Sequence, residues 1–330
     1  MKKLSLGRNG PMVAEYGLGC MGMSGGYGSA DDKESIATIH AALEAGITMI
    51  DTGDFYGMGH NEMLIRDALR GTRQRAFIAV KCGAMRAPNL QFIGDDGRPN
   101  SVKNFLAYSL RRLGTDYVDL YQPSRVDPTV PIEDTIGAIA DMVKAGYVRH
   151  IGISEASAKT VRRAHAVHPI AALQIEYSLF SRGIEHETLA TLRELGIALV
   201  AYGVLSRGLI GDHAEASRSA GEIRTRQPRF SAENFPKNLA LVEALRKIAR
   251  EKGASTAQLA FAWVKSRGDD IVPLIGARRR DQLQEALGAR DLKLTPDDLA
   301  RIERAAPATA VAGARYLPAV LAHMDSEHSG

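Results

Sequence analysis

Four stretches of the chain repeat one pattern, in which an amphipathic helical segment ends at a glycine and a mostly apolar segment follows. They read AALEAGITMID, SLRRLGTDYVDL, DMVKAGYVRHIGIS and TLRELGIALVAY, with glycines at Gly46, Gly114, Gly146 and Gly196. Glycine suits the left-handed position that closes a helix, and a nearly continuous apolar run is typical of a parallel strand buried on both faces. The pattern therefore predicts a repeated unit of helix, glycine and parallel strand.

Strand-like segments alternate with helical patterns along the whole chain. We place the strands at residues 13–19, 48–51, 77–82, 118–121, 150–154, 173–178, 198–205 and 271–276. Ile132, Ile136, Ile139 and Val143 fall on one helical face, and Thr295 followed by a proline has the form of a helix cap. Eight strands in this alternation, with no break in composition, predict a single-domain (β/α)8 TIM barrel over residues 1–330.

Two connections are longer than ordinary loops. They cover residues 83–100 after the third strand and 211–234 after the seventh. We expect both, together with the C-terminal tail at 307–330, to lie over the barrel mouth.

The composition argues against a membrane protein, a secreted protein, a metalloprotein and a nucleic-acid-binding protein. A hydrophobic fraction of 45% without an apolar run of membrane-spanning length predicts a protein with a full core and no membrane partner. The first residues lack the features of a secretion signal, and Cys20 and Cys82 are too few for a disulfide framework, so we expect a cytoplasmic protein without a metal site. Basic residues are interspersed with nearly as many acids, which argues against a nucleic-acid partner.

The segment GLGCMG, residues 17–22, has the GxGxxG spacing of a dinucleotide-binding fingerprint. In the Rossmann unit a helix starts at once after these glycines, whereas helical periodicity here begins only near Asp32. We therefore reject the Rossmann interpretation and expect the glycines to let a barrel loop approach a ligand closely.

Polar residues stand at the predicted strand ends, where barrels of this kind carry their active sites. The second strand ends at Asp51, with Tyr56 shortly after it, and the third strand ends with Lys81. A nearby ammonium lowers the pKa of a phenol, and a carboxylate keeps a buried ammonium charged. We predict Tyr56 as a general acid supported by Lys81 and Asp51. The alternative is structural, with a capping aspartate, a tyrosine packed at the rim and a lysine with a buried stem.

Six segments resemble, in order and over almost the whole chain, the successive motifs of the aldo-keto reductase superfamily. They read DTGDFYGMGHNE, VKCG, GISEAS, LQIEYSLFSR, AYGVLSRGLI and PLIGARRRDQLQEALGA. The pattern is most similar to bacterial and plant members that resemble potassium-channel β subunits and auxin-induced reductases. This resemblance implies NADPH-dependent reduction of a small carbonyl substrate, with the cofactor extended across the mouth of a (β/α)8 barrel.

The resemblance also implies a role for individual residues. Tyr56 would be the proton donor, Ser154 and Gln174 would hold the nicotinamide carboxamide, and Tyr202 would stack on the nicotinamide ring. The remaining cofactor contacts would come from the first strand end, the pyrophosphate segment and the adenosine segment: Gly19, Cys20 and Met21; Gly203, Leu205 and Arg207; Gly276, Arg278, Arg279, Gln282 and Glu285. A guanidinium can pair with the 2′-phosphate that NADH lacks, so we expect NADPH and prefer Arg278 as its partner.

Three positions depart from the family pattern. Glu155 and Ala286 stand where many members have asparagine. The usual text DLYYQHRVDP reads DLYQPSRVDP here, so Ser124 stands in place of the catalytic histidine. A histidine there donates to the substrate carbonyl, an interaction that can be worth ~3 kcal/mol. Ser124 could replace it directly or through a water, Tyr56 could act alone, the substrate could be unusually reactive, or activity could be lost.

Two further functions remain open beside carbonyl reduction. One is a nucleotide-bound interaction or redox-sensor protein with little turnover, and the other is a phosphate-binding lyase or isomerase. Phe55, Met21, Met23, Met58 and Met85 indicate an apolar substrate pocket. The motifs leave the substrate, the oligomeric state and the physiological direction undetermined.

Overall fold

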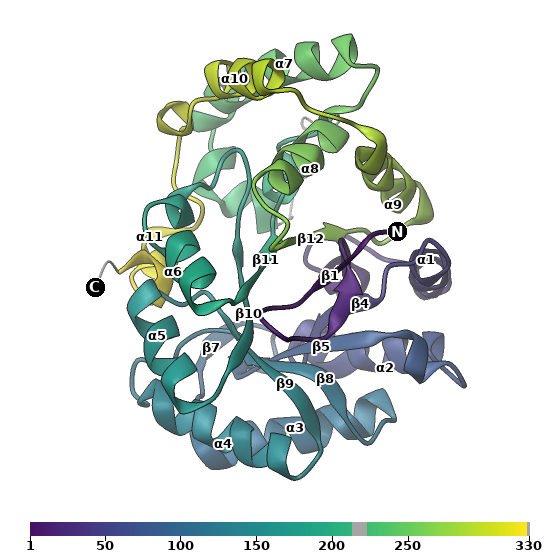
Figure 1. Ribbon diagram of the computed structural model, residues 1–330, viewed down its shortest axis with the longest axis vertical. Coiled ribbons are helices and arrows are strands. Elements are labelled where there is room, and N and C mark those ends of the chain that lie inside the picture. Colours follow the sequence, from purple (N-terminus) through teal and green to yellow (C-terminus); the bar gives the residue numbers. More distant parts are fainter. Residues whose placement is uncertain (213–222, 329–330) are drawn as a thin grey trace.

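The computed structural model describes residues 1–212 and 223–328 (Figure 1). Its strands are β1 (Lys3–Ser5), β2 (Met12–Ala14), β3 (Gly17–Gly19), β4 (Met49–Gly53), β5 (Phe77–Cys82), β6 (Ala84–Arg86), β7 (Phe92–Asp95), β8 (Val118–Pro123), β9 (Val148–Ser154), β10 (Ile170–Glu176), β11 (Ala198–Tyr202) and β12 (Ile271–Gly276). Its α-helices are α1 (Asp32–Glu44), α2 (His60–Ala68), α3 (Pro99–Leu113), α4 (Ile132–Lys144), α5 (Ala158–Val167), α6 (Thr188–Leu195), α7 (Asn234–Glu251), α8 (Thr256–Ser266), α9 (Arg280–Leu287), α10 (Pro296–Ala305) and α11 (Pro318–Leu321).

Eight parallel strands close into a barrel in the order β3, β4, β5, β8, β9, β10, β11, β12. Each pairs with its neighbours in parallel register, and β12 closes the ring through Leu274 opposite Gly17. Helices surround the ring (Figure 1). The predicted (β/α)8 barrel is confirmed, while its organisation as one domain over residues 1–330 stays a prediction.

The predicted first strand, 13–19, is wrong in its extent. Only β3 belongs to the barrel, while β2 pairs antiparallel with β1 in a separate hairpin. Leu4, Leu6 and Val13 of this N-terminal segment pack against the inward side chains of the barrel strands. The hairpin covers the amino-terminal end of the barrel, because the apolar side chains there would otherwise face water.

The helix signals are confirmed. Gly46, Gly114, Gly146 and Gly196 adopt φ values of 90°, 63°, 85° and 71°, the left-handed conformation that a side chain would strain. Thr295 caps α10 in a capping box, with its side chain accepting from the backbone N–H of Asp298.

The long connections carry structure of their own. Residues 83–100 contain the antiparallel hairpin β6–β7. Residues 211–234 contain short 3-10 turns at Ile223–Arg226 and Pro228–Phe230, while the part of this predicted lid at 213–222 lies outside the described residues. In the tail, Arg315 and Tyr316 reach side chains at the strand ends. Beyond the barrel helices, α7 and α10 pack against each other.

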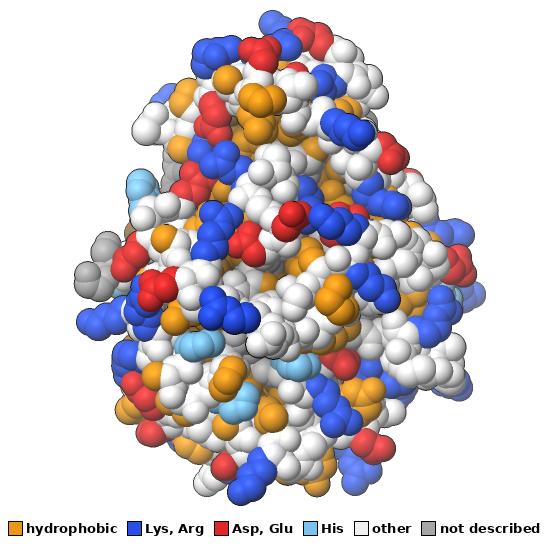
Figure 2. Space-filling view, in the orientation of Figure 1, with side chains coloured by type: hydrophobic (Ala, Val, Ile, Leu, Met, Phe, Trp, Pro, Cys, Tyr) orange, Lys and Arg blue, Asp and Glu red, His pale blue; other side chains and the backbone are white. Residues whose placement is uncertain are grey.

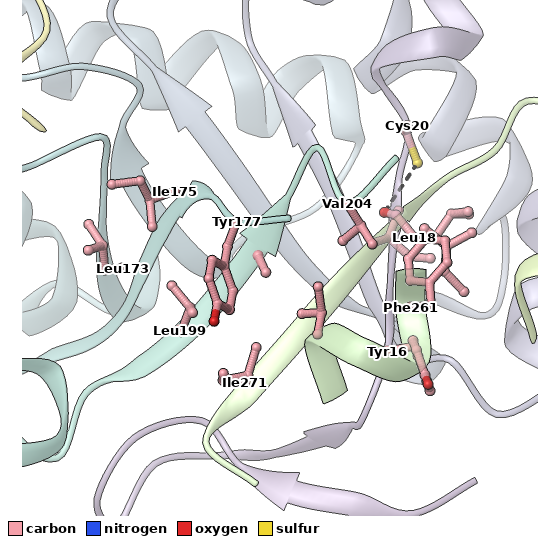
Figure 3. Close-up of a cluster of buried hydrophobic side chains, with 14 of the residues drawn as sticks. Tyr16, Leu18, Cys20, Leu173, Ile175, Tyr177, Leu199, Val204, Phe261 and Ile271 are labelled. Atoms are coloured by element: carbon pink, nitrogen blue, oxygen red, sulfur yellow. Dashed lines mark hydrogen bonds between the residues drawn. The ribbon is translucent and has the colours of Figure 1, made fainter. Parts of the chain in front are cut away.

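Side chains on the outer face of the barrel form most of the core. Figure 3 shows Leu173, Ile175 and Leu199 on one side and Leu18 with Phe261 on the other, all buried. Strand residues alternate between the two faces, so these outer positions pack on helices while their neighbours in sequence enter the barrel. The alternation decides which residues can reach the barrel mouth.

The exposed surface and the helices bear on the nucleic-acid and membrane partners that composition argued against. Acidic and basic side chains intermingle on the face shown in Figure 2. None of the helices in the described ranges is both long enough and apolar enough to span a bilayer. Residues 1–212 and 223–328 also contain no His, Cys, Asp and Glu group arranged to hold a metal.

Candidate active site

A polar layer fills the carboxyl-terminal end of the barrel interior, two residues further along each strand than an apolar layer. The apolar residues are Met49, Ala79, Leu120 and Ala172, and the polar ones are Asp51, Lys81, Gln122 and Gln174. The two-residue period of a strand keeps both sets on the same face. Four strands therefore bring buried polar side chains together just below the mouth.

Lys81 and Asp51 form a buried ion pair in this layer. The Lys81 Nζ donates to both carboxylate oxygens of Asp51, at 2.7 and 2.8 Å, and Gln174 Nε2 donates to Asp51 Oδ2 at 2.7 Å. Burial lowers the pKa of Lys81, and the charge of Asp51 opposes that shift. The predicted pair Asp51 and Lys81 thus meets, and Gln174, which we expected at the carboxamide, donates to the same carboxylate.

Tyr56 lies above this pair, in the turn that follows β4. The Lys81 Nζ is 5.2 Å from the centroid of the Tyr56 ring, and Phe55 packs edge-to-face on the same ring at 4.8 Å. Burial and the charge of Asp51 raise the pKa of Tyr56 well above its ordinary value, while Arg125 opposes them. We expected Lys81 to lower this pKa, but its ammonium is held by the Asp51 carboxylate. Tyr56 is therefore a neutral phenol at neutral pH.

Two buried polar groups in the layer have no hydrogen-bond partner among the described residues. They are the hydroxyl of Ser154 and the side-chain amide of Gln122. Leaving such groups unsatisfied costs about 1–3 kcal/mol each, so they mark a place where a ligand or water would bind. An amide ligand over Ser154 would satisfy its hydroxyl, which fits the residue expected to hold a carboxamide.

Gln122 is a site residue that our sequence reasoning missed. Room for its side chain comes from Gly152 on the next strand, where a Cβ atom would lie 2.8 Å from Gln122 Oε1. The alternation on β8 was the available signal, since Leu120 and Gln122 both point inward when Tyr121 points outward.

Ser124 lies buried beside the hairpin β6–β7. Its backbone N–H donates to the carbonyl of Cys82 at 2.8 Å, and its hydroxyl makes a long contact of 3.5 Å with Asp95 Oδ1. Burial raises the pKa of Asp95 to about 6, although Arg125 and the Ser124 hydroxyl oppose the shift. The hydroxyl is thus directed at a carboxyl group, and its role toward a substrate carbonyl stays a prediction.

The C-terminal tail is bound to the strand ends through Glu155. Arg315 donates to both oxygens of the Glu155 carboxylate, at 3.0 and 2.6 Å, and the Tyr202 hydroxyl donates to it at 2.6 Å. Burial alone would raise the pKa of Glu155, but Arg315 outweighs it and the pKa falls to about 2. The Tyr202 hydroxyl also lies 2.8 Å from that of Tyr316. Sequence reasoning left the role of Glu155 uncertain and missed both tail residues, which no local pattern distinguishes.

The segment expected at the pyrophosphate turns sharply after β11. Gly203 and Arg207 adopt positive φ values of 69° and 60°, and Leu205 lies between them. The Arg207 guanidinium donates to the backbone carbonyl of Arg315 at 2.9 Å and stacks 4.3 Å from the ring of Tyr316. The tail and this segment therefore contact each other at one side of the mouth.

The segment expected at the adenosine end follows β12. Gly276 ends the strand, Gln282 Oε1 accepts from the Arg278 N–H at 3.2 Å, and Glu285 is exposed on α9. The Arg278 side chain donates to the backbone carbonyl of Tyr27, in the loop after β3. Arg279 instead pairs with Asp281 at 3.0 Å. Of the two arginines, Arg278 is the one that reaches the neighbouring loop after β3.

The sequence and the barrel of this chain are similar to those of known proteins. The chain matches the model of the Aldo/keto reductase family over residues 15–307. It belongs to that family. It is 41% identical to probable aldo-keto reductase 1 of Glycine max over 321 residues, which cover 96% of this chain and 92% of the relative.

Solved structures agree with this assignment. The glycerol dehydrogenase of Gluconobacter oxydans superposes with a TM-score of 0.83 at 28% identity, over 92% of this chain and 94% of its own. The holo form of an aldo-keto reductase from Bacillus halodurans gives 0.76 at 28% identity, over 93% and 97%. Carbonyl reduction with NAD(P)H is the chemistry of this family, so the chain is an oxidoreductase.

One residue expected at the mouth of this aldo/keto reductase, Cys20, has its side chain elsewhere. Gly19 ends β3 and Met21 begins the next turn, but the Cys20 side chain packs in the outer core beside Leu18 (Figure 3). The Cys20 N–H donates to the Asp51 carbonyl, and its own carbonyl accepts from Asn61.

The expected apolar pocket also changes. Met23 is buried in the outer core and Met58 is largely exposed, so neither lines a pocket in the way we predicted. His60 bridges Ser24 at 2.9 Å and Asp32 at 3.2 Å, contacts that orient the start of α2.

Proposed function

We propose that this aldo/keto reductase uses NADPH to reduce an aldehyde or ketone to the alcohol, with Tyr56 as the proton donor. The observation that carries the proposal is the neutral Tyr56 phenol above the buried Lys81–Asp51 pair. A barrel interior has no structural need for a buried ion pair, and apolar residues of similar size would fill the space at least as well. The pair is therefore best explained by a chemical role.

When bound, NADPH supplies a hydride to the carbonyl carbon. Tyr56 Oη donates its proton to the carbonyl oxygen as negative charge develops there, which completes the alcohol. The resulting phenolate lies near Lys81 and under the influence of Arg125, two cations that stabilise it until it takes a proton from water. Gln174 donates to Asp51 and holds its carboxylate in place. The carboxylate in turn holds the Lys81 ammonium below the Tyr56 ring.

The residues at the mouth fit a dinucleotide. The unsatisfied Ser154 hydroxyl suits the carboxamide, together with Gln174, and Tyr202 lies at the end of β11 for the ring. The orientation of Arg278 toward the loop after β3 supports its assignment to the 2′-phosphate, and hence NADPH over NADH.

The test is the initial rate of NADPH consumption over a panel of aromatic, aliphatic and sugar aldehydes, for the native protein and Tyr56→Phe. We expect the variant to lose about 10²- to 10⁴-fold in kcat/KM with any aldehyde that the native protein reduces. Tyr108→Phe, an exposed tyrosine on α3, is the matched control and should change nothing. Equal rates for native protein and Tyr56→Phe would refute the role of Tyr56.

One observation favours a second function, a nucleotide-bound interaction or redox-sensor protein. The serine that stands in place of the family histidine is buried, and its hydroxyl faces Asp95. This function would be supported if the protein binds NADPH tightly, as measured by quenching of protein fluorescence, but reduces no aldehyde in the panel.

A further inference from the structure

Arg125 follows Ser124 at the end of β8, and its guanidinium lies in the mouth. Its charge interacts with side chains from the turn after β4, the hairpin β6–β7, the ends of β9 and β11, and the tail: Tyr56, Asp95, Glu155, Tyr202 and Tyr316. These elements converge only above the polar layer. Arg125 therefore stands over the same space as the hydroxyl of the proposed proton donor.

Among the described residues, Arg125 has no ion pair, in contrast to Arg207, Arg229 and Arg315 of the mouth. Arg207 and Arg229 each lie 3.5 Å from Glu176, and Arg315 pairs with Glu155 at 2.6 Å. The hydrogen bond of Arg125 runs from Nη1 to the Ser124 carbonyl at 2.6 Å, and no carboxylate in residues 1–212 or 223–328 is within ion-pairing distance of it. One edge of a permanently charged guanidinium is left for another partner.

A second arginine without an ion pair in the described structure stands at the rim. Arg86, on β6, lies 5.8 Å from the Phe55 ring and 5.5 Å from the Phe92 ring, and it donates to the Leu90 carbonyl at 3.5 Å. Asp95 is the carboxyl group whose charge acts on both arginines. With Glu155 and its partner Arg315 included, three cations face two acids, so this side of the mouth keeps an excess of positive charge.

Burial of the Arg125 cation is costly, and the charges of Asp95 and Glu155 offset that cost from a distance, without a direct ion pair among the described residues. A bound anion would add the direct hydrogen bonds. The planar fork of a guanidinium matches a carboxylate with two parallel hydrogen bonds. Phe55, which packs on Tyr56, and Phe92 offer apolar ring surface beside Arg86, which suits the body of an organic molecule. The same side of the mouth therefore combines an anion-binding group with an apolar wall.

We propose that the carbonyl substrate carries a carboxylate and that Arg125 binds it. This proposal rests on the proposed function and adds the class of substrate: aldehyde or keto acids, which the reaction converts to hydroxy acids. Arg86 at the rim attracts the anion and Arg125 fixes it, so that the carbonyl oxygen comes to Tyr56.

The experiment compares para-formylbenzoate with its methyl ester, which has the same ring and aldehyde without the charge. The native protein should have a kcat/KM at least about tenfold higher for the acid, and Arg125→Gln should lower this value by about 30- to 100-fold. The ester should lose less than about tenfold, because it has no anion to lose and only the influence of Arg125 on the Tyr56 phenolate disappears. Arg125→Lys should recover part of the loss, because it keeps the charge without the fork. Arg75→Gln, an exposed arginine before β5 at the other end of the barrel, is the control.

Three results would overturn the proposal. The first is a kcat/KM for the ester as high as that for the acid. The second is an equal loss of kcat/KM for both compounds in Arg125→Gln. The third is a loss of kcat/KM for the acid in Arg75→Gln as large as that in Arg125→Gln. Binding of the product, para-hydroxymethylbenzoate, gives a reading that does not depend on turnover. If neither aldehyde is reduced, the proposed function fails, and product binding that is lost in Arg125→Gln still supports the anion site. Equal product binding in native protein and Arg125→Gln refutes the site itself.

Discussion

The two ends of the barrel interior are built from the same strands but contain opposite kinds of side chains. At the amino-terminal end, Leu4, Leu6 and Val13 cover an apolar layer in which every side chain is satisfied by packing alone. At the carboxyl-terminal end, Lys81 and Asp51 need each other, while Gln122 and Ser154 have no partner among the described residues. The amino-terminal end stabilises the fold by apolar packing, whereas the carboxyl-terminal end contains polar groups whose burial costs free energy.

This contrast between the two ends indicates that the carboxyl-terminal end is the functional one. Burial of a polar group costs little free energy only when its hydrogen-bond or ion-pair partner is present. Removing a single partner at the polar end should therefore lower the free energy of unfolding. The apolar end depends on packed volume instead. Substitutions at the two ends should therefore separate stability from activity.

The largest effect on the polar end is expected from Lys81→Met. It leaves the Asp51 carboxylate buried without its counter-ion, which should lower the free energy of unfolding by about 3–5 kcal/mol and abolish carbonyl reduction. Urea unfolding measures the free energy of unfolding, and NADPH consumption measures carbonyl reduction. The double variant Lys81→Met/Asp51→Asn should regain most of the stability but no activity. Lys103→Met breaks a more exposed pair with Asp141 and should cost under about 1 kcal/mol. A similar cost for Lys81→Met and Lys103→Met would contradict the comparison.

The apolar end should show the reverse. Leu6→Ala removes buried volume from the covering segment and should lower the free energy of unfolding by about 2–5 kcal/mol. The kcat/KM of the folded protein should stay within about twofold of the native value, because the mouth lies at the other end. Met12→Ala, on the same hairpin but exposed, should cost about 0.5 kcal/mol or less. A loss of activity in folded Leu6→Ala would show that the two ends are coupled.

A third effect concerns pH and the contact between Glu155 and the tail. The pKa of Glu155 is about 2 in the folded protein against an ordinary value of 4.5. A lowered carboxyl pKa stabilises the fold above the ordinary pKa, and this stability is lost as the pH falls toward the folded value. The native protein should therefore exceed Glu155→Gln in unfolding free energy by about 3 kcal/mol near neutral pH, and the gap should shrink as the pH falls below 4.5. Chemical unfolding at a series of pH values measures the gap. A gap that does not change with pH would argue against this ion pair.

The smallest effect is expected at the outer rim of the polar end, where Arg278 and Arg279 differ in their contacts. Arg278→Gln should weaken NADPH binding by about tenfold and leave NADH binding nearly unchanged, because only NADPH has the 2′-phosphate. Arg279→Gln, whose arginine already pairs with Asp281, should change either affinity by less than about twofold. Fluorescence titration with the two nucleotides measures both. Equal losses for NADPH and NADH would remove Arg278 from phosphate binding.

Much of the barrel could be predicted from short-range patterns. The strand segments and the four closing glycines were recognisable because a strand period or a helix end involves residues only a few positions apart. Asp51 and Lys81 were recognisable for the same reason, as polar residues that end apolar runs. The hairpin β1–β2 was missed because residues 13–19 read as one apolar segment, and only the closed barrel shows that its first half must cover the end.

The polar side chains of the mouth were harder to place than the strands. Glu155 and Arg315 are 160 positions apart in the sequence, and their contact requires the tail to return across the barrel. Ser124 was noticed as a substitution, but its contact with Asp95 depends on how the hairpin β6–β7 folds over β8. The lack of an ion pair at Arg125 within the described structure is likewise a property of the assembled mouth.

The order of residues along this chain was enough to establish an alternating barrel, the polar strand ends and the resemblance to aldo-keto reductases, since each depends on spacing within one element or motif. The pairing of Lys81 with Asp51, the covering of the apolar end, the attachment of the tail to Glu155 and the environment of Arg125 came only from the folded chain. The physical reason is that charge, burial and hydrogen bonding depend on distance in space, and closing the barrel brings together side chains that the sequence keeps far apart.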